Sequence, residues 1–175
     1  MKKTFLIAAA LLFTFVSCNK RYTQQSKEID TFKKVTELYG DGKFDEMAVF
    51  YADSAKIINN VPDEFAQTVQ QRIAQNKEES LLFSIWKINK TKAEYEMVVT
   101  DKGEIWVNYW GQWEGTLRSN NKMYIIPTSI TARFVDGKIT REVGYWDDSK
   151  LLTDLQQAET VSNIEIPDQL KMAKK

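Results

Sequence analysis

The chain has 175 residues, of which 43% are hydrophobic and 12% aromatic, with only three prolines. Such a composition excludes an intrinsically disordered chain and predicts a folded core. Basic and acidic residues number 24 each, so the formal net charge is zero. Because nucleic-acid-binding proteins carry a basic excess, this balance predicts no nucleic-acid partner.

The amino terminus has the order of residues of a secretory signal peptide. Lys2 and Lys3 precede an uncharged apolar run over residues 5–16, and the run ends at Ser17 and the only cysteine, Cys18. A transmembrane helix needs about 20 apolar residues, more than this run provides. We therefore predict cleavage and export. The alternative of an uncleaved anchor would also leave the domain outside the cytoplasm.

The segment Val16-Ser17-Cys18 resembles the end of a bacterial lipoprotein signal, although Phe15 stands where that motif usually has Leu, Val or Ile. The resemblance implies that Cys18 is lipidated and anchors the protein in the membrane of the cell envelope, on its periplasmic or cell-surface side. The alternative is a soluble secreted protein with an unpaired thiol, because a lone exported cysteine has no disulfide partner.

Removal of the signal would leave 158 residues with 22 basic and 24 acidic side chains, a net charge of minus two. That length is typical of a single domain. We divide the chain into a signal peptide (1–17), a lipidated polar tether (18–25), one domain (26–158) and a C-terminal tail (159–175).

The first half of the domain has the apolar spacing of helices. Ser26 can cap a helix whose apolar residues recur at helical spacing, namely Ile29, Phe32, Val35, Leu38 and Tyr39. A second short helix is expected over residues 44–51, a short strand over 55–58 and a third helix from Pro62. Residues 81–88 fit a helix or a strand equally well.

From Lys92 onward the pattern changes to alternating strands. Strands are predicted over residues 93–99, 104–117, 123–135 and 138–146, separated by turn dipeptides at 102–103, 120–121 and 136–137. Asp136-Gly137 predicts a type I′ turn, and Gly111 and Gly115 indicate a bulge or bend within the longest strand. Helices followed by an antiparallel meander predict an α+β fold with a curved sheet around the helices.

Two motifs carry a resemblance to a known family. Residues 42–45 and 50–55 read GKFD and FYADSA, and residues 133–139 read RFVDGKI, with Tyr145-Trp146-Asp147 ending the next strand. In this order and spacing the motifs resemble the SnoaL-like, nuclear transport factor 2-like superfamily. The resemblance implies a cone-shaped, curved antiparallel sheet packed on N-terminal helices, an architecture also called cystatin-like.

The same resemblance implies a ligand pocket at the wide mouth of the cone. The positions expected to face it are Asn59, Trp106, Asn108, Trp110, Gln112, Ile130, Ala132, Glu142 and Trp146. The two-residue period independently places residues 106, 108, 110, 112 and 114 on one strand face, and aromatic rings mixed with polar groups are typical of a pocket. The alternative is that these tryptophans simply fill the core.

The reverse face of that strand is apolar as well. It carries Ile105, Val107, Tyr109 and Trp113. Because many members of the superfamily pair through the outer sheet surface, we interpret this face as the outer one and expect a homodimer through it.

The residues available for catalysis are few. The chain has no histidine, which excludes Ser-His-Asp and Cys-His schemes and the usual imidazole zinc sites. No glycine-rich phosphate loop is present. We predict no metal and no cofactor.

The ketosteroid isomerases of the superfamily use an aspartate base and an oxyanion hole formed by a tyrosine and an aspartate. The matching positions here are Asn59, Val35 and Ile130, and an amide cannot accept a proton at ordinary pH. Glu142 is the remaining candidate acid or base, because desolvation among tryptophans raises a carboxyl pKa. Alternatively it is an exposed residue paired with a lysine or arginine.

These observations predict an exported lipoprotein whose domain binds a small apolar or aromatic ligand, or acts as a protein-interaction module, without catalysis. The first alternative is a SnoaL-like enzyme of isomerase, cyclase or hydrolase type that uses Glu142. The second is a purely structural dimer.

Overall fold

The computed structural model describes residues 21–162, so Cys18, the expected signal peptide and the residues after 162 lie outside the described residues. Four α-helices lie within this part of the chain: α2 (Lys27–Gly40), α3 (Phe44–Met47), α4 (Val69–Ser80) and α5 (Ser149–Ser162). Three short 3-10 helices, η2 (Ala48–Phe50), η3 (Asp63–Phe65) and η4 (Lys90–Lys92), join the longer elements.

Among residues 21–162, seven strands form one curved sheet. They are β1 (Tyr22–Thr23), β2 (Tyr51–Asn59), β3 (Phe83–Ile88), β4 (Glu94–Val99), β5 (Ile105–Leu117), β6 (Met123–Val135) and β7 (Lys138–Trp146). The order is β1-β4-β5-β6-β7-β2, and β3 pairs with the second half of β5. The predicted meander from β4 to β7 is confirmed, whereas β2 lies parallel to β7. The predicted α+β class is therefore correct.

Local signals explain most element boundaries. The Ser26 side chain accepts a hydrogen bond from the backbone N–H of Ile29 and begins α2 as expected. A helix does start after Pro62, as predicted, but it is only the 3-10 helix η3. The α-helix starts later, because Gln67 forms a backbone bridge with Ile57 of β2 and holds the chain extended. Thr68 then opens α4 with a capping box.

The structure also shows the conformation of the turn at residues 136–137 and of the segment 83–88. Asp136 and Gly137 both have positive φ, as the predicted type I′ turn requires. Residues 83–88, which fitted a helix or a strand, form β3 against β5. Residues 22–23 of the expected tether form β1 against β4, so this part of the chain is attached to the sheet edge.

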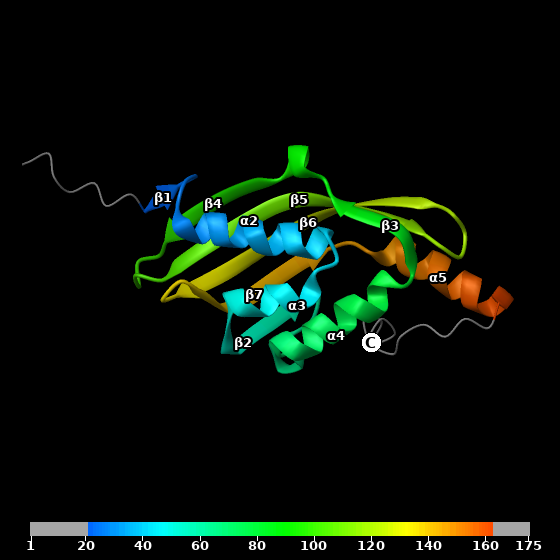
Figure 1. The fold of residues 1–175 in the computed structure, drawn as a ribbon, viewed down its shortest axis with the longest axis horizontal. Coiled ribbons are helices and arrows are strands. Elements are labelled where there is room, and N and C mark those ends of the chain that lie inside the picture. Colours follow the sequence, from blue (N-terminus) through cyan, green and yellow to red (C-terminus); the bar gives the residue numbers. More distant parts are fainter. Residues whose placement is uncertain (1–20, 163–175) are drawn as a thin grey trace, which may run out of the picture.

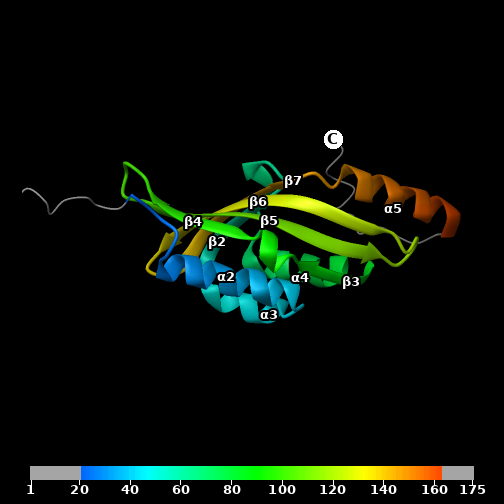
Figure 2. The same cartoon turned by 90° about the horizontal axis from the view of Figure 1, so that it is seen from above.

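Helices α2, α3 and α4 cover one face of the sheet, and α5 lies at the far end (Figures 1 and 2). Two hydrophobic clusters result. The first joins α2 and α3 to β2 and the sheet, and the second joins α5 to β3, β5 and β6. Tyr39, Trp86 and Ile88 pack against both clusters.

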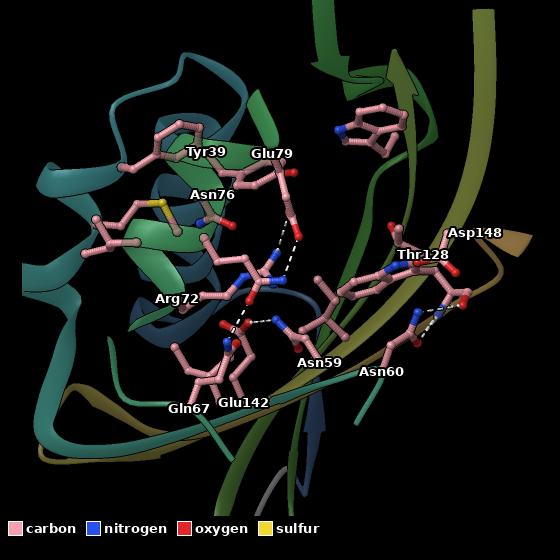
Figure 3. A pocket seen from close by; sticks show the side chains of 18 of the residues that line it. Tyr39, Asn59, Asn60, Gln67, Arg72, Asn76, Glu79, Thr128, Glu142 and Asp148 are labelled. Atoms are coloured by element: carbon pink, nitrogen blue, oxygen red, sulfur yellow. Dashed lines mark hydrogen bonds and ion pairs between the residues drawn. The ribbon is translucent and has the colours of Figure 1, made fainter. Parts of the chain in front are cut away.

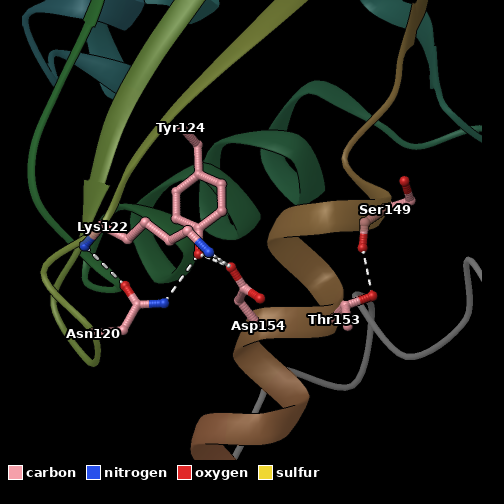
Figure 4. Close-up of polar contacts among 6 residues, drawn as sticks. All are labelled: Asn120, Lys122, Tyr124, Ser149, Thr153 and Asp154. Atoms are coloured by element: carbon pink, nitrogen blue, oxygen red, sulfur yellow. Dashed lines mark hydrogen bonds and ion pairs between the residues drawn. The ribbon is translucent and has the colours of Figure 1, made fainter.

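Polar contacts fix α5 to the turn between β5 and β6 (Figure 4). The Tyr124 hydroxyl and the Lys122 ammonium both donate to Asp154, at 2.5 and 2.8 Å. These hydrogen bonds hold the pKa of Asp154 below its usual value. At the N-terminal end of α5, the Asp147 side chain accepts from the backbone N–H of Ser149, an Asx turn that leads into the helix.

Within residues 21–162, none of the helices is both long and apolar enough to cross a membrane.

Candidate functional site

A cavity of about 900 Å³ lies between the helices and the inner face of the sheet (Figure 3). Its volume is at the upper end of the range typical of small-molecule sites. Most of its wall consists of aromatic and aliphatic side chains, including Phe32, Tyr39, Tyr51, Trp86, Tyr109, Trp113, Ile126, Ile130, Trp146 and Leu152.

The β5 wall of the cavity alternates aromatic residues with glycines. A Cβ on Gly111 would lie 1.8 Å from the Tyr109 hydroxyl, and a Cβ on Gly115 would lie 2.0 Å from the Trp113 ring. Each ring therefore lies over the glycine two residues further along its own strand. The β5–β6 register runs without a shift from Ile105 to Thr116, so of the expected bulge or bend the bulge is absent from this pairing. The sheet is curved as expected, and the glycines also make room for the rings.

The face of β5 that lines the cavity is not the predicted face but the opposite one. Tyr109 and Trp113 line the cavity, whereas Trp106, Asn108, Trp110 and Gln112 do not. The exposed fraction of Trp110 is 43%, against 1% for Tyr109. This corrects the assignment for all four residues, and it makes the face with Ile105, Val107, Tyr109 and Trp113 the inner one.

The polar side chains on the outer face of β5 form hydrogen bonds with neighbouring side chains of the same sheet face. The Asn108 side chain donates to Glu96 and accepts from Thr131, at 3.1 and 2.7 Å. Gln112 donates to Glu114 at 2.8 Å. The two Asn108 contacts are cross-strand pairs, which stabilise a sheet face. They explain why this face is rich in amides without being a pocket.

The other predicted positions lie at or near the cavity. Asn59, Ile130, Glu142 and Trp146 line it. Ala132 is fully buried in the first hydrophobic cluster and is not part of the wall.

Glu142 is the centre of a buried hydrogen-bond group. The Tyr51 hydroxyl donates to its Oε2 at 2.5 Å, and the Asn59 amide donates to its Oε1 at 2.8 Å. Only 6% of Glu142 is exposed. Burial, followed by the charge of Glu142, raises the pKa of Tyr51 well above its usual value, so the hydroxyl stays protonated and remains a donor.

Gly144 and Asn60 position this group. Gly144 pairs with Asn59, and a Cβ on it would lie 2.5 Å from Asn59 Oδ1. The Asn59 side chain therefore needs a glycine beside it. The next residue, Asn60, has the left-handed φ of 56° and exchanges two hydrogen bonds with the backbone of Trp146, at 2.9 and 3.0 Å.

Helix α4 supplies a polar wall that sequence reasoning missed. Arg72, Asn76 and Glu79 line the cavity, and their spacing of four and three residues is the only signal that places them on one helix face. The Arg72 guanidinium lies 3.6 Å from the Glu79 carboxylate, and Gln75 donates to Glu79 at 2.6 Å.

Residues 21–162 contain no group of three or more potential metal ligands among His, Cys, Asp and Glu. What the site offers is a large apolar space with one buried carboxylate, whose oxygens each accept a hydrogen bond.

Solved structures with the same architecture are similar to this chain. One is a SnoaL-like protein from Jannaschia sp. CCS1 assigned as a polyketide cyclase, with 16% identity, a TM-score of 0.59 and coverage of 74% of this chain and 92% of that one. The fold is that of the SnoaL-like, nuclear transport factor 2-like proteins.

Two further structures of this SnoaL-like fold are also assigned as polyketide cyclases. IdmH from Streptomyces antibioticus has 15% identity and a TM-score of 0.59, with 75% of this chain and 99% of that chain covered. A protein from Xanthomonas campestris pv. campestris has 16% identity and a TM-score of 0.57, with 78% and 99% covered. Neither a protein-family model nor a curated protein sequence matches this chain.

The SnoaL-like fold also locates the three positions compared with the ketosteroid isomerases. Val35, Asn59 and Ile130 all line the cavity. None of these side chains can exchange a proton at ordinary pH. The positions that the sequence resemblance matched to the isomerase residues therefore lie at the cavity wall as an amide and two aliphatic side chains.

Proposed function

We propose that the domain binds a small apolar or aromatic molecule in the cavity between α2, α3, α4 and the sheet. The observation that carries this proposal is the cavity of about 900 Å³ with a largely aromatic wall. Protein interiors are normally packed with few voids larger than a water molecule. A hollow of this size, kept open by glycines beneath Tyr109 and Trp113, fits a binding site better than a core.

The test uses N-phenyl-1-naphthylamine, whose fluorescence rises in apolar surroundings. We expect saturable binding that Ile130→Trp weakens at least about tenfold, because the added ring occupies the cavity. The matched control is Thr131→Trp, since the next residue of β6 lies on the outer face beside Asn108. Equal binding by both variants and the parent, with all three folded by circular dichroism, would place the probe elsewhere and refute the proposal.

We further propose that the protein is a lipoprotein anchored in the cell envelope through Cys18. The support is the signal-like order of residues 1–18. Radiolabelled palmitate should be incorporated into the parent protein, which should fractionate with membranes. The Cys18→Ser variant should incorporate no label, and a labelled Cys18→Ser protein would contradict the proposed attachment site.

A second copy of the chain is the partner that we propose for the outer sheet face. Large apolar side chains are exposed there, namely Ile85, Trp110, Met123, Ile125 and Tyr145. Exposed apolar patches of this kind mark interaction sites. Light scattering should show a concentration-dependent dimer that Ile125→Asp dissociates. Val49→Asp, at an exposed position outside the strands, should leave the dimer intact, and a monomer at all concentrations would exclude this partner.

A further inference from the structure

Glu142 is a buried carboxylate that forms no ion pair with any of the described residues. Its two oxygens accept hydrogen bonds from Tyr51 and Asn59, which are both neutral donors. Within the described residues, Arg72 is paired with Glu79, and Arg141 is paired with Asp63. Removing an ion from water is unfavourable unless an opposite charge and hydrogen bonds compensate it. In the described part of the protein, the two neutral donors therefore compensate the negative charge of Glu142 only in part.

The cavity wall as a whole also has more acidic than basic side chains. In the part of the chain that the structure describes, the wall has one cation, Arg72, and three carboxylates, Glu79, Glu142 and Asp148. Three carboxylates against one cation leave an excess of acidic side chains, although the charge of Arg72 reaches both Glu79 and the Tyr51 hydroxyl beside Glu142. Burial raises the pKa of Asp148, as expected for a carboxyl group in this position.

Further acceptors add to the negative potential. The Asn59 amide must turn its nitrogen toward Glu142, because a carboxylate only accepts hydrogen bonds. Its oxygen, Oδ1, and that of Asn76 are buried without a hydrogen-bond partner. The aromatic rings of the wall are further candidates for contact with a cation, because the face of a π-system carries negative partial charge.

We infer that the ligand of this cavity is an organic cation, an amine with an apolar or aromatic body, whose ammonium group compensates the Glu142 carboxylate. This inference rests on the proposed binding function and adds the charge of the ligand. The apolar body contacts the aromatic wall, and cation–π attraction adds to the interaction. An anionic ligand meets the uncompensated carboxylates and is repelled.

Three matched probes test the charge of the ligand by isothermal titration calorimetry. These are 2-naphthylmethylamine, which is cationic at neutral pH, 2-naphthylmethanol, which is neutral, and 2-naphthoate, which is anionic. We expect the amine to bind roughly tenfold or more tightly than the alcohol, as for a charge-assisted hydrogen bond in a buried site. The naphthoate should bind most weakly.

Two glutamine variants identify the carboxylate responsible. Glu142→Gln should remove the preference for the amine over the alcohol while the alcohol still binds. Glu114→Gln is the matched control, because Glu114 is also little exposed and hydrogen-bonded but faces outward beside Gln112 and Lys87. It should keep the preference. If Glu142→Gln does not fold, the ranking of the three probes on the parent protein still decides the question.

The outcomes separate this inference from the proposed function. Binding of N-phenyl-1-naphthylamine, together with equal affinities for the amine and the alcohol or with naphthoate as the tightest probe, would overturn the cationic ligand and leave the apolar site intact. The inference would also fail if Glu114→Gln removed the preference and Glu142→Gln did not. No binding of any of the four compounds would overturn both.

Discussion

At the scale of single residues, Asn60 joins the ends of β2 and β7 through its side chain. Its amide accepts from Trp146 N–H and donates to Trp146 C=O, so it extends the parallel ladder where the two backbones separate. Its left-handed φ suits asparagine, which tolerates that conformation better than most residues. The indole of Trp146 is thereby held at the cavity wall.

Asn60→Ala should lower the free energy of unfolding by about 1–3 kcal/mol, because two backbone groups lose their hydrogen bonds. Urea denaturation measures the change. Asn121→Ala is the control, since Asn121 also has positive φ, at 53°, without bridging two strands. Equal losses in both variants would mean that backbone strain, and not the hydrogen bonds of the side chain, accounts for the effect.

Tyr39 provides a prediction of pH dependence. Burial raises its pKa to about 12, whereas an unfolded tyrosine titrates near 10. Since the folded state binds the proton more tightly, the contribution of Tyr39 to stability is complete below about pH 10 and is lost as the pH rises toward 12. Urea midpoints should therefore fall over this range, and the fall should be smaller in Tyr39→Phe.

Tyr145→Phe is the matched control for Tyr39, because Tyr145 is mostly exposed on the outer face. Its alkaline profile should match that of the parent protein. An identical fall in the parent and in Tyr39→Phe would show that other groups, such as Tyr95, whose pKa burial also raises to about 12, account for the alkaline loss.

At the scale of elements, the sequence predicted where β5 begins and ends but not which of its two faces lines the cavity. The two-residue period separates its side chains into two faces, but aromatic residues occur on both. The observation that distinguishes the faces is the position of Gly111 and Gly115, which share the face of Tyr109 and Trp113. An aromatic ring that lies flat along its own strand needs a neighbour without a Cβ. A ring that stands in solvent does not.

Other elements show the same limit on what sequence can predict. The bounds of β6 and β7 were predicted correctly from turn residues and alternation, which are local signals. The parallel pairing of β2 with β7 joins strands about 85 residues apart. No local pattern encodes such a pairing. The polar wall of α4 was missed for a related reason, because polar residues on a helix normally face solvent.

Gly111→Ala tests the role of the glycines in β5. The added Cβ would displace the Tyr109 ring into the cavity, so we expect a loss of about 1–3 kcal/mol in stability and weaker binding of N-phenyl-1-naphthylamine. The same change in a Tyr109→Leu background should cost little, since the ring is gone. Equal costs in the two backgrounds, measured as a double-mutant cycle, would show that Gly111 serves the backbone and not the ring.

At the scale of the whole molecule, the cavity separates two hydrophobic clusters that share only a few side chains. A ligand between them contacts both, because the wall includes Phe32 of the first cluster and Leu152 of the second. Binding to the folded state raises the free energy of unfolding in proportion to the logarithm of ligand concentration. The clusters at the two ends of the molecule should therefore gain stability together.

The position of β1 has a consequence for the proposed anchor. Residues 22–23 pair with β4, and Arg21 forms an ion pair with Asp101 in the turn between β4 and β5. Only residues 19–21 separate Cys18 from β1, and the four Cα steps from Cys18 to Tyr22 span about 14 Å at most. The end of the molecule that carries this turn must then lie close to the membrane. The turn between β5 and β6 lies at the opposite end of β5 (Figure 1).

Fluorophores on Lys102→Cys and Asn120→Cys test this orientation in the lipidated protein on vesicles that contain nitroxide-labelled lipid headgroups. The 13 residues of β5 span roughly 40 Å between the two turns. The label at position 102 should be strongly quenched and the label at 120 hardly at all. The Cys18→Ser background should abolish the quenching at 102. Equal quenching at both positions would mean that the domain lies flat on the membrane or is free to tumble, and that β1 does not set its orientation.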